Sequence, residues 1–136
     1  IIFDKNNFFL IDWREDFGGN LNYGDLYYDL AKLYGGIEMN YDIIKKGNFS
    51  YSEKKNNIFY EFDSRKSLMS MIKKQYEKFI LHKNLSLEKI EILKCLIYIN
   101  MSPLHEYPFD KLLFAHGKYQ LYKSLKKYEY ISKQIN

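Results

Sequence analysis

The sequence has little cysteine and proline and lacks a long apolar run. Its single cysteine, Cys95, cannot form a disulfide within the chain, which excludes the class of secreted domains stapled by internal disulfides. No apolar stretch approaches the roughly 18 residues that span a bilayer, and the first residues lack the cationic start of a signal peptide. We therefore expect a reduced, cytoplasmic protein that does not insert into a membrane, with Cys95 in its core.

A strong excess of one charge is also absent. The chain has 21 Lys and Arg residues against 17 Asp and Glu residues, spread along its length. This excess is too small and too dispersed to predict a nucleic-acid-binding protein. Zinc-spaced Cys and His residues, a Ser–His–Asp set and a dinucleotide fingerprint are missing as well. Aromatic residues, by contrast, are abundant, with 14 Tyr and 10 Phe.

The pattern of elements predicts an α+β fold that is mainly helical, in a single domain of residues 1–136. Residues 1–36 should contain a short β-hairpin, a loop and a first helix. Residues 37–136 should be mainly helical, with a second hairpin near 48–62. There, aromatic and apolar residues alternate on both sides of the turn formers at 54–57.

Local signals set the expected elements of the first part. The apolar segments Ile1–Phe3 and Phe8–Ile11 flank a polar turn and predict the hairpin. A loop rich in glycine and asparagine follows. Asp25 is a suitable N-cap for the helix after it, which should end at Gly35 and Gly36.

Three further helices are expected in the second part. The first runs to about His82, the second begins after Ser86, and the third begins at about Phe109 with a kink at Gly117. Their apolar stripes are Leu68, Ile72, Tyr76 and Phe79, then Ile90, Leu93, Ile97 and Met101, and finally Leu121, Leu125 and Tyr128.

The stretch FFLIDWRED contains the main candidate for a metal ligand. Its four apolar residues predict a strand that ends directly at the carboxylate of Asp12. One interpretation is an ordinary turn or cap residue. The other is a Mg²⁺ ligand, because phosphoryl-transfer enzymes hold a hard anionic oxygen on a rigid element beside the nucleotide phosphates.

The order of motifs around Asp12 resembles the C-terminal half of the aminoglycoside phosphotransferase and choline kinase superfamily, relatives of the protein kinases. FFLIDW, then a loop, then YGDLYYDLA is similar to the family's strand ending in Ile-Asp-aromatic, followed by Gly-Asp and Asp-hydrophobic-Ala. The resemblance implies the C-terminal lobe of a protein-kinase-like fold, in which short hairpins precede a helical subdomain. It also implies that Asp12 binds Mg²⁺ on the phosphates of ATP, that Asp29 supports the catalytic loop, and that Asp25 is a cap.

The sequence departs from this family in its loop. The spacing from Asp12 to Asp29 is longer than in typical members, and Arg14 stands where choline kinases tend to have a glutamate. Glu15 or Asp16 then serves either as a second acidic group near the metal or as solvated loop charge. These departures leave Asp12 in place, but with them the resemblance does not identify the kinase subclass or its substrate.

Two parts of a kinase active site are missing from the sequence. It has no H-x-D-x-x-x-x-N catalytic loop and no N-terminal lobe with a phosphate-contacting lysine. In the family, the asparagine of that loop directly precedes an apolar strand such as IIF. We therefore expect a C-terminal fragment that has no catalytic residue of its own and is inactive alone. The missing lobe would come from the same chain or from another one.

The resemblance implies a kinase that uses ATP and Mg²⁺ to phosphorylate the hydroxyl of a small molecule, such as a sugar, choline or an amino alcohol. It is nearest to kinase-like proteins of bacterial surface-polysaccharide synthesis. Acceptor-binding candidates are His105, Glu106 and Tyr107, since a carboxylate and an aromatic face suit a hydroxylated or cationic molecule. The alternative interpretation is an ordinary loop between helices, which the place of Asp110 in the first turn of the last helix favours.

An alternative function is a non-catalytic helical module that binds a protein or an anionic partner. Lysine pairs and runs such as Lys45–Lys46, Lys73–Lys74 and Lys123–Lys127 are interleaved with tyrosines, as in proteins that bind single strands. Solvated helix faces explain these lysines too. Substitution of Asp12 separates the two hypotheses, because only the kinase depends on its carboxylate.

Overall fold

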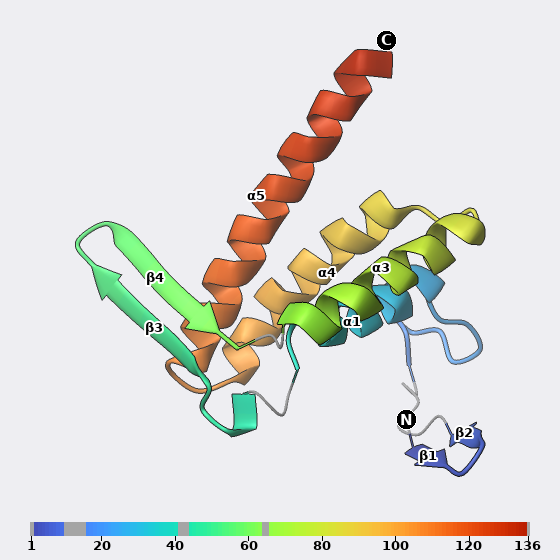
Figure 1. Ribbon diagram of the computed structural model, residues 1–136, viewed down its shortest axis with the longest axis horizontal. Coiled ribbons are helices and arrows are strands. Elements are labelled where there is room, and N and C mark those ends of the chain that lie inside the picture. Colours follow the sequence, from blue (N-terminus) through green and yellow to red (C-terminus); the bar gives the residue numbers. More distant parts are fainter. Residues whose placement is uncertain (1, 10–15, 41–43, 64–65, 136) are drawn as a thin grey trace.

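A computed structural model describes residues 2–9, 16–40, 44–63 and 66–135 of the chain (Figure 1). These residues form an α+β structure that is mainly helical, as predicted. The helices are α1 (Leu26–Glu38), α3 (Lys66–His82), α4 (Leu87–Met101), the 3₁₀ turn η1 (Ser102–Leu104) and α5 (Phe109–Ile135). The strands are β1 (Ile2–Asp4), β2 (Asn7–Phe9), β3 (Phe49–Lys54) and β4 (Asn57–Phe62), paired as two hairpins.

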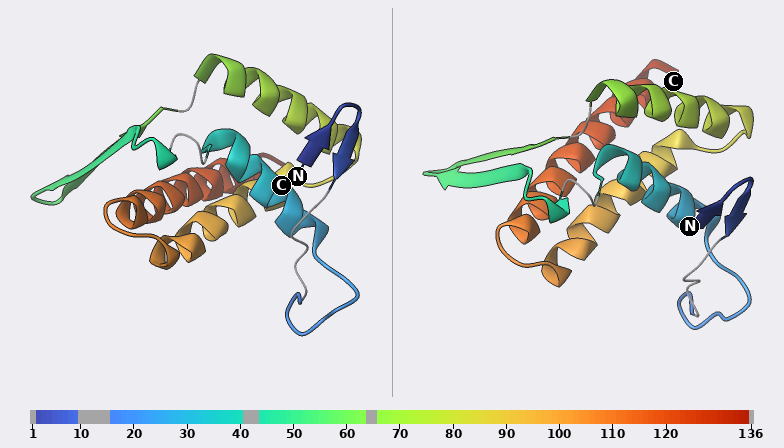
Figure 2. Two further views of the ribbon diagram at one scale, coloured as in Figure 1. Left: turned by 90° about the horizontal axis from the view of Figure 1, so that it is seen from below. Right: turned by 60° about the horizontal axis from the view of Figure 1, so that its bottom comes forward.

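The N-terminal hairpin forms where the sequence predicts it. β1 and β2 are antiparallel, with Ile2 opposite Phe9 and Asp4 opposite Asn7. Lys5 in the turn has a φ of 52°, the left-handed conformation of many tight turns. Figures 1 and 2 show this hairpin on the opposite side of the molecule from β3–β4.

The first helix begins as predicted and ends later than predicted. Asp25 caps it, but the helix continues through Gly35 and Gly36 to Glu38. Gly35 lies against α4, where its carbonyl accepts a hydrogen bond of 2.8 Å from the Tyr98 hydroxyl. A Cβ on Gly35 would lie 3.4 Å from that hydroxyl oxygen. The expected C-cap was wrong, because Gly35 admits the Tyr98 ring instead of ending the helix.

The core lies along α4, which packs against α1 on one side and α5 on the other. Ile90 of α4 lies in one cluster with residues of α1 and α3, and Tyr98 lies in a second cluster with the start of α5. Cys95 is fully buried, as expected. The largest fully buried side chains come from four of the predicted helices: Tyr34 in α1, Ile80 in α3, Ile90 and Cys95 in α4, and Leu112 in α5.

α5 continues through Gly117 as one helix, and the glycine serves close packing. A Cβ at Gly117 would lie 2.8 Å from Cγ1 of Ile99 and 3.1 Å from the Cys95 carbonyl oxygen, both on α4. The expected kink at Gly117 was therefore wrong. The glycine instead allows α4 and α5 to approach each other closely. α5 is the longest helix, and none in the described part of the chain is long and apolar enough to cross a membrane.

Two predicted apolar stripes are only partly buried. In α3, Tyr76 and Ile80 are buried, whereas Leu68 and Phe79 are about half exposed. α3 covers the body with one narrow face, so residues flanking that face remain in solvent. Leu125 of α5 is exposed for a similar reason, because the buried side of this helix is formed by Leu112, Leu113, His116, Gly117 and Ser124.

The second hairpin also matches its prediction. Phe49 pairs with Phe62 and Tyr51 pairs with Tyr60, which places these rings on one face. That face packs at its base against α5, where the rings of Phe49 and Phe109 are 5.5 Å apart. The outer half of the hairpin extends away from the helices (Figure 1).

Candidate functional site

The predicted metal ligand Asp12 and the second acidic candidate Glu15 lie outside the described residues. The described chain ends on one side at Phe9 of β2 and resumes at Asp16. The roles of both residues therefore stay predictions. Of the predicted site, the structure describes only the loop that begins at Asp16 and helix α1 after it.

The loop after Asp16 is organised by its own polar groups. The Asp16 carboxylate accepts a hydrogen bond from the backbone N–H of Gly19. Gly18 and Gly19 have φ values of 62° and 84°, a conformation that suits glycine because it has no Cβ. The Phe17 ring lies 5.6 Å from the ring of Tyr28 and so connects the loop to α1. One Asp16 oxygen is thus engaged in the turn itself.

Asp25 and Asp29 lie at the start of α1. The Asp25 carboxylate accepts a hydrogen bond of 2.8 Å from the Tyr27 N–H, which confirms Asp25 as the helix cap. Asp29 is exposed in the first turn, where the helix dipole favours a negative charge. Its role as support for a catalytic loop stays a prediction, because the described residues include no such loop.

The structure separates the acceptor-binding candidates from Asp29. His105 lies in the wall of a pocket of about 200 Å³ together with Gly36 and Met39, at the C-terminal end of α1. α1 has 13 residues and is therefore roughly 20 Å long, with Asp29 in its first turn. Glu106 is exposed and Tyr107 is 73% exposed. These three residues share one loop, but the fold does not bring them to the end of α1 that carries Asp29.

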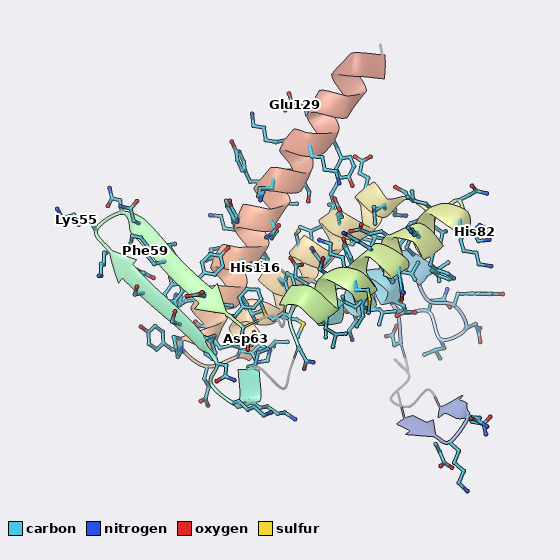
Figure 3. All side chains as sticks on the ribbon, in the orientation of Figure 1. Lys55, Phe59, Asp63, His82, His116 and Glu129 are labelled. Atoms are coloured by element: carbon cyan, nitrogen blue, oxygen red, sulfur yellow. The ribbon has the colours of Figure 1, made fainter. Side chains whose placement is uncertain are left out.

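Sequence reasoning missed a buried charged cluster formed by Glu38, Lys94 and His116. The Lys94 ammonium donates a hydrogen bond to the Glu38 carboxylate, and the two side chains are 6% and 19% exposed. Nε2 of His116 lies 3.7 Å from the other Glu38 oxygen, an ion-pair distance if the imidazole is protonated. Figure 3 labels His116 on α5, and its ring lies 5.2 Å from that of Phe62 at the base of the hairpin.

The electrostatics of this cluster favour an ionised carboxylate. Burial alone would raise the pKa of Glu38, but His116 and Lys94 outweigh burial and lower the pKa to about 2. Burial raises the pKa of the Tyr98 hydroxyl well above its usual range, so Tyr98 remains a donor to the Gly35 carbonyl. The cluster joins α1, α4 and α5 and is largely buried, which makes it an anchor between helices.

A sequence signal for the cluster was weak. Lys94 lies inside the apolar run ILKCLIYI, where a charged residue requires a buried partner or an exposed position. Nothing near Lys94 in the sequence identifies Glu38 or His116 as that partner. The contact is between distant segments and appears only in the folded chain.

No group of three or more His, Cys, Asp or Glu side chains suited to a metal ion is present within the residues that the structure describes. Comparisons with protein-family models, curated proteins and solved structures found no match to this chain. The likeness to phosphotransferases therefore depends on the motifs around Asp12 and Asp29.

Proposed function

We propose that residues 1–136 form the C-terminal part of a kinase that uses ATP and Mg²⁺ to phosphorylate the hydroxyl of a small molecule. The supporting observation is the order of elements around Asp12. A hairpin precedes it, and a loop with two left-handed glycines and the capped helix α1 follow it. This is the order of elements that the resemblance of FFLIDW and YGDLYYDLA to the family implies.

In this proposal Asp12 is the ligand of Mg²⁺. A carboxylate is the hard oxygen donor that Mg²⁺ prefers, and the ion would neutralise charge on the nucleotide phosphates. Glu15 is a candidate second acidic group. Asp16 is less suited to this role because its carboxylate accepts the Gly19 N–H. Asp29, exposed beside the Asp25 cap, would hold the catalytic loop through a hydrogen bond.

The proposal assigns the catalytic base and the phosphate-contacting lysine to residues beyond these 136. An acceptor such as a sugar, choline or an amino alcohol, a cytoplasmic location where ATP is available, and a role in bacterial surface-polysaccharide synthesis all belong to it. The loop His105–Tyr107 remains a candidate for acceptor binding only if another segment connects it to the metal site.

The test begins with the coding sequence upstream of Ile1, in which we expect an in-frame H-x-D-x-x-x-x-N motif. Phosphate transfer from ATP to a panel of sugars, choline and ethanolamine is then measured for the whole gene product. Asp12→Asn should lower turnover about a hundredfold or more, since it removes the metal's charged ligand. Asp16→Asn is the matched control and should keep most of the activity. Full turnover by Asp12→Asn would exclude the metal assignment, and absence of any transfer by the wild type would exclude the kinase.

A further inference from the structure

The pocket of about 200 Å³ at the C-terminal end of α1 is the most enclosed space that the described residues form with apolar walls on several helices. We call it the α1 pocket. Side chains of α1, α4, α5 and the loop after η1 line it, and all of them belong to the described part of the chain. Figure 2 shows α1 and α4, which pack against each other, side by side.

The wall of the α1 pocket is mostly apolar and contains sulfur atoms and aromatic rings. Met39 and Phe109 are buried in this wall, and Met101 is partly buried. Thioether sulfurs make favourable contacts with aromatic rings, and rings also pack well on the edges of other rings. A flat aromatic ring therefore suits this wall.

Two lysines line the pocket, but the groups that hold their ammoniums lie outside its wall. The Lys94 ammonium is paired with Glu38 and lies 4.8 Å from the centre of the Tyr34 ring. The Lys32 ammonium lies 5.8 Å from the centre of the Tyr28 ring. The lysines thus contribute their alkyl stems to the wall. A charged ligand would lose its water without gaining a countercharge inside the pocket.

One polar atom of a wall residue has no partner. Nε2 of His105 is buried and makes no hydrogen bond with any described residue. The Tyr98 hydroxyl of the same wall, by contrast, already donates to the Gly35 carbonyl. A buried polar atom without a partner costs free energy, and a nitrogen of a neutral imidazole can bond to a hydroxyl as donor or as acceptor. His105 therefore offers a place for one hydroxyl.

We propose that the α1 pocket binds a small uncharged aromatic molecule with one hydroxyl group, that is, a simple phenol. Its ring would fill the space between Met39, Met101 and Phe109, and its hydroxyl would bond to Nε2 of His105. An apolar cavity of about 150 Å³ is sufficient for benzene, so about 200 Å³ holds such a ring with roughly two further non-hydrogen atoms. The ligand would supply the dispersion contacts that the empty pocket lacks.

This inference does not depend on the proposed kinase function. The pocket lies at the C-terminal end of α1, whereas Asp29 lies in the first turn of that helix. A sugar has many hydroxyls and choline has a positive charge, and the apolar wall matches neither. Binding of a phenol therefore neither requires nor supports phosphate transfer, and each proposal can fail alone.

The first test is a titration of the 136-residue chain with p-cresol, followed by NMR of methionines labelled with carbon-13 in their methyl groups. Met39 and Met101 line the pocket, whereas Met69 and Met71 lie on α3 outside its wall and are the internal control. Only the first two signals should shift, with a Kd of about 1 mM or below, which about eight non-hydrogen atoms can provide. Unchanged Met39 and Met101 signals, or equal shifts of all four, overturn the proposal.

The second test blocks the pocket. Gly36 lines it, and a Cβ at this position would meet no atom within 4 Å. Gly36→Leu therefore adds a side chain at the pocket without displacing a neighbour, and competition for the same space should weaken p-cresol binding about tenfold or more. Ser70→Leu, at an exposed position of α3 outside the wall, is the matched control and should bind like the wild type. Equal binding by Gly36→Leu and Ser70→Leu overturns the site.

The third test examines the hydroxyl and the charge of the ligand. Toluene is p-cresol without its hydroxyl, and His105→Phe keeps a ring beside Phe109, whose centre lies 5.0 Å from that of His105. The ratio of the two Kd values should change about fivefold against p-cresol in this variant, as expected for one hydrogen bond. Benzoate should bind the wild type at least about tenfold more weakly than p-cresol because of its charge. An unchanged ratio overturns the role of His105, and tighter binding of benzoate overturns the uncharged ligand in favour of an anion.

Discussion

Glu38 and Lys94 form an ion pair between α1 and α4 although only 19% and 6% of their side chains are exposed to solvent. His116 of α5 lies beside the same carboxylate. A buried pair has a desolvation cost that its mutual attraction must offset, so its net contribution is small compared with the cost of leaving one partner alone. The pair is therefore a sensitive point of the fold.

Glu38→Gln should lower the free energy of unfolding by about 3 to 5 kcal/mol at neutral pH, because it leaves the Lys94 ammonium buried without a countercharge. Urea unfolding followed by circular dichroism measures this change. Glu88→Gln is the control: Glu88 is exposed in the first turn of α4, and its loss should cost less than about 1 kcal/mol. Equal losses in the two variants would argue against an uncompensated charge as the cause.

The stability of the chain should fall in acid because of Glu38. Its pKa is lowered from 4.5 to about 2 in the folded protein, so the stabilisation is present above the unfolded pKa and is lost as the pH falls through the folded pKa. The loss is of the order of 3 kcal/mol between about pH 5 and pH 2. Unfolding curves measured across that range should show it for the wild type. The curve for Glu38→Gln should be flatter, and a parallel curve would assign the acid sensitivity to other carboxylates.

Gly117→Ala should destabilise the protein by roughly 1 to 3 kcal/mol, because its Cβ would lie 2.8 Å from Cγ1 of Ile99 on α4. Gly36→Ala, also inside a helix, meets nothing within 4 Å and should stabilise by up to about 1 kcal/mol through helix propensity. Thermal unfolding of both variants measures the difference. Stabilisation by both substitutions would mean that α4 and α5 can separate without cost.

Asp25→Ala should cost about 1 kcal/mol, because it removes the acceptor for the Tyr27 N–H. Asp25→Ser should keep most of the stability that Asp25→Ala loses, since a serine hydroxyl caps equally well. The comparison by urea unfolding distinguishes a cap from a charge requirement. If Asp25→Ser is as unstable as Asp25→Ala, a hydroxyl cap is not sufficient and the longer carboxylate side chain is required.

Cys95 should react slowly with a water-soluble disulfide reagent in the folded protein. The thiol is fully buried, and burial raises its pKa, so little reactive thiolate is present. Reaction should become rapid and stoichiometric in concentrated urea. Rapid modification without denaturant would indicate that α4 and α5 open readily at Gly117.

Local signals predicted the starts of helices and the hairpins well. Asp25 and Ser86 both accept hydrogen bonds from the first turns that they precede, and the alternation in 49–62 predicted the hairpin in which the structure pairs Tyr51 with Tyr60. These features depend on residues a few positions apart, so the sequence is sufficient to identify them.

Features that depend on distant residues were missed or predicted wrongly. Gly35 was expected to end a helix, because its contact with Tyr98 is invisible along the chain. The exposure of Leu68 and Phe79 depends on how little of α3 the other helices cover. In the candidate site, the Asp25 cap was predictable, whereas the distance of His105 from Asp29 follows from helix packing.

The three residues of the buried cluster also bear on the order of folding. Glu38 and Lys94 are 56 positions apart, and His116 lies on a third helix. We expect such contacts to close only after α1, α4 and α5 have docked, and therefore to contribute little to the folding rate. The cluster should instead slow the opening of the assembled helices, and the lifetime of the native state would then depend on a single carboxylate.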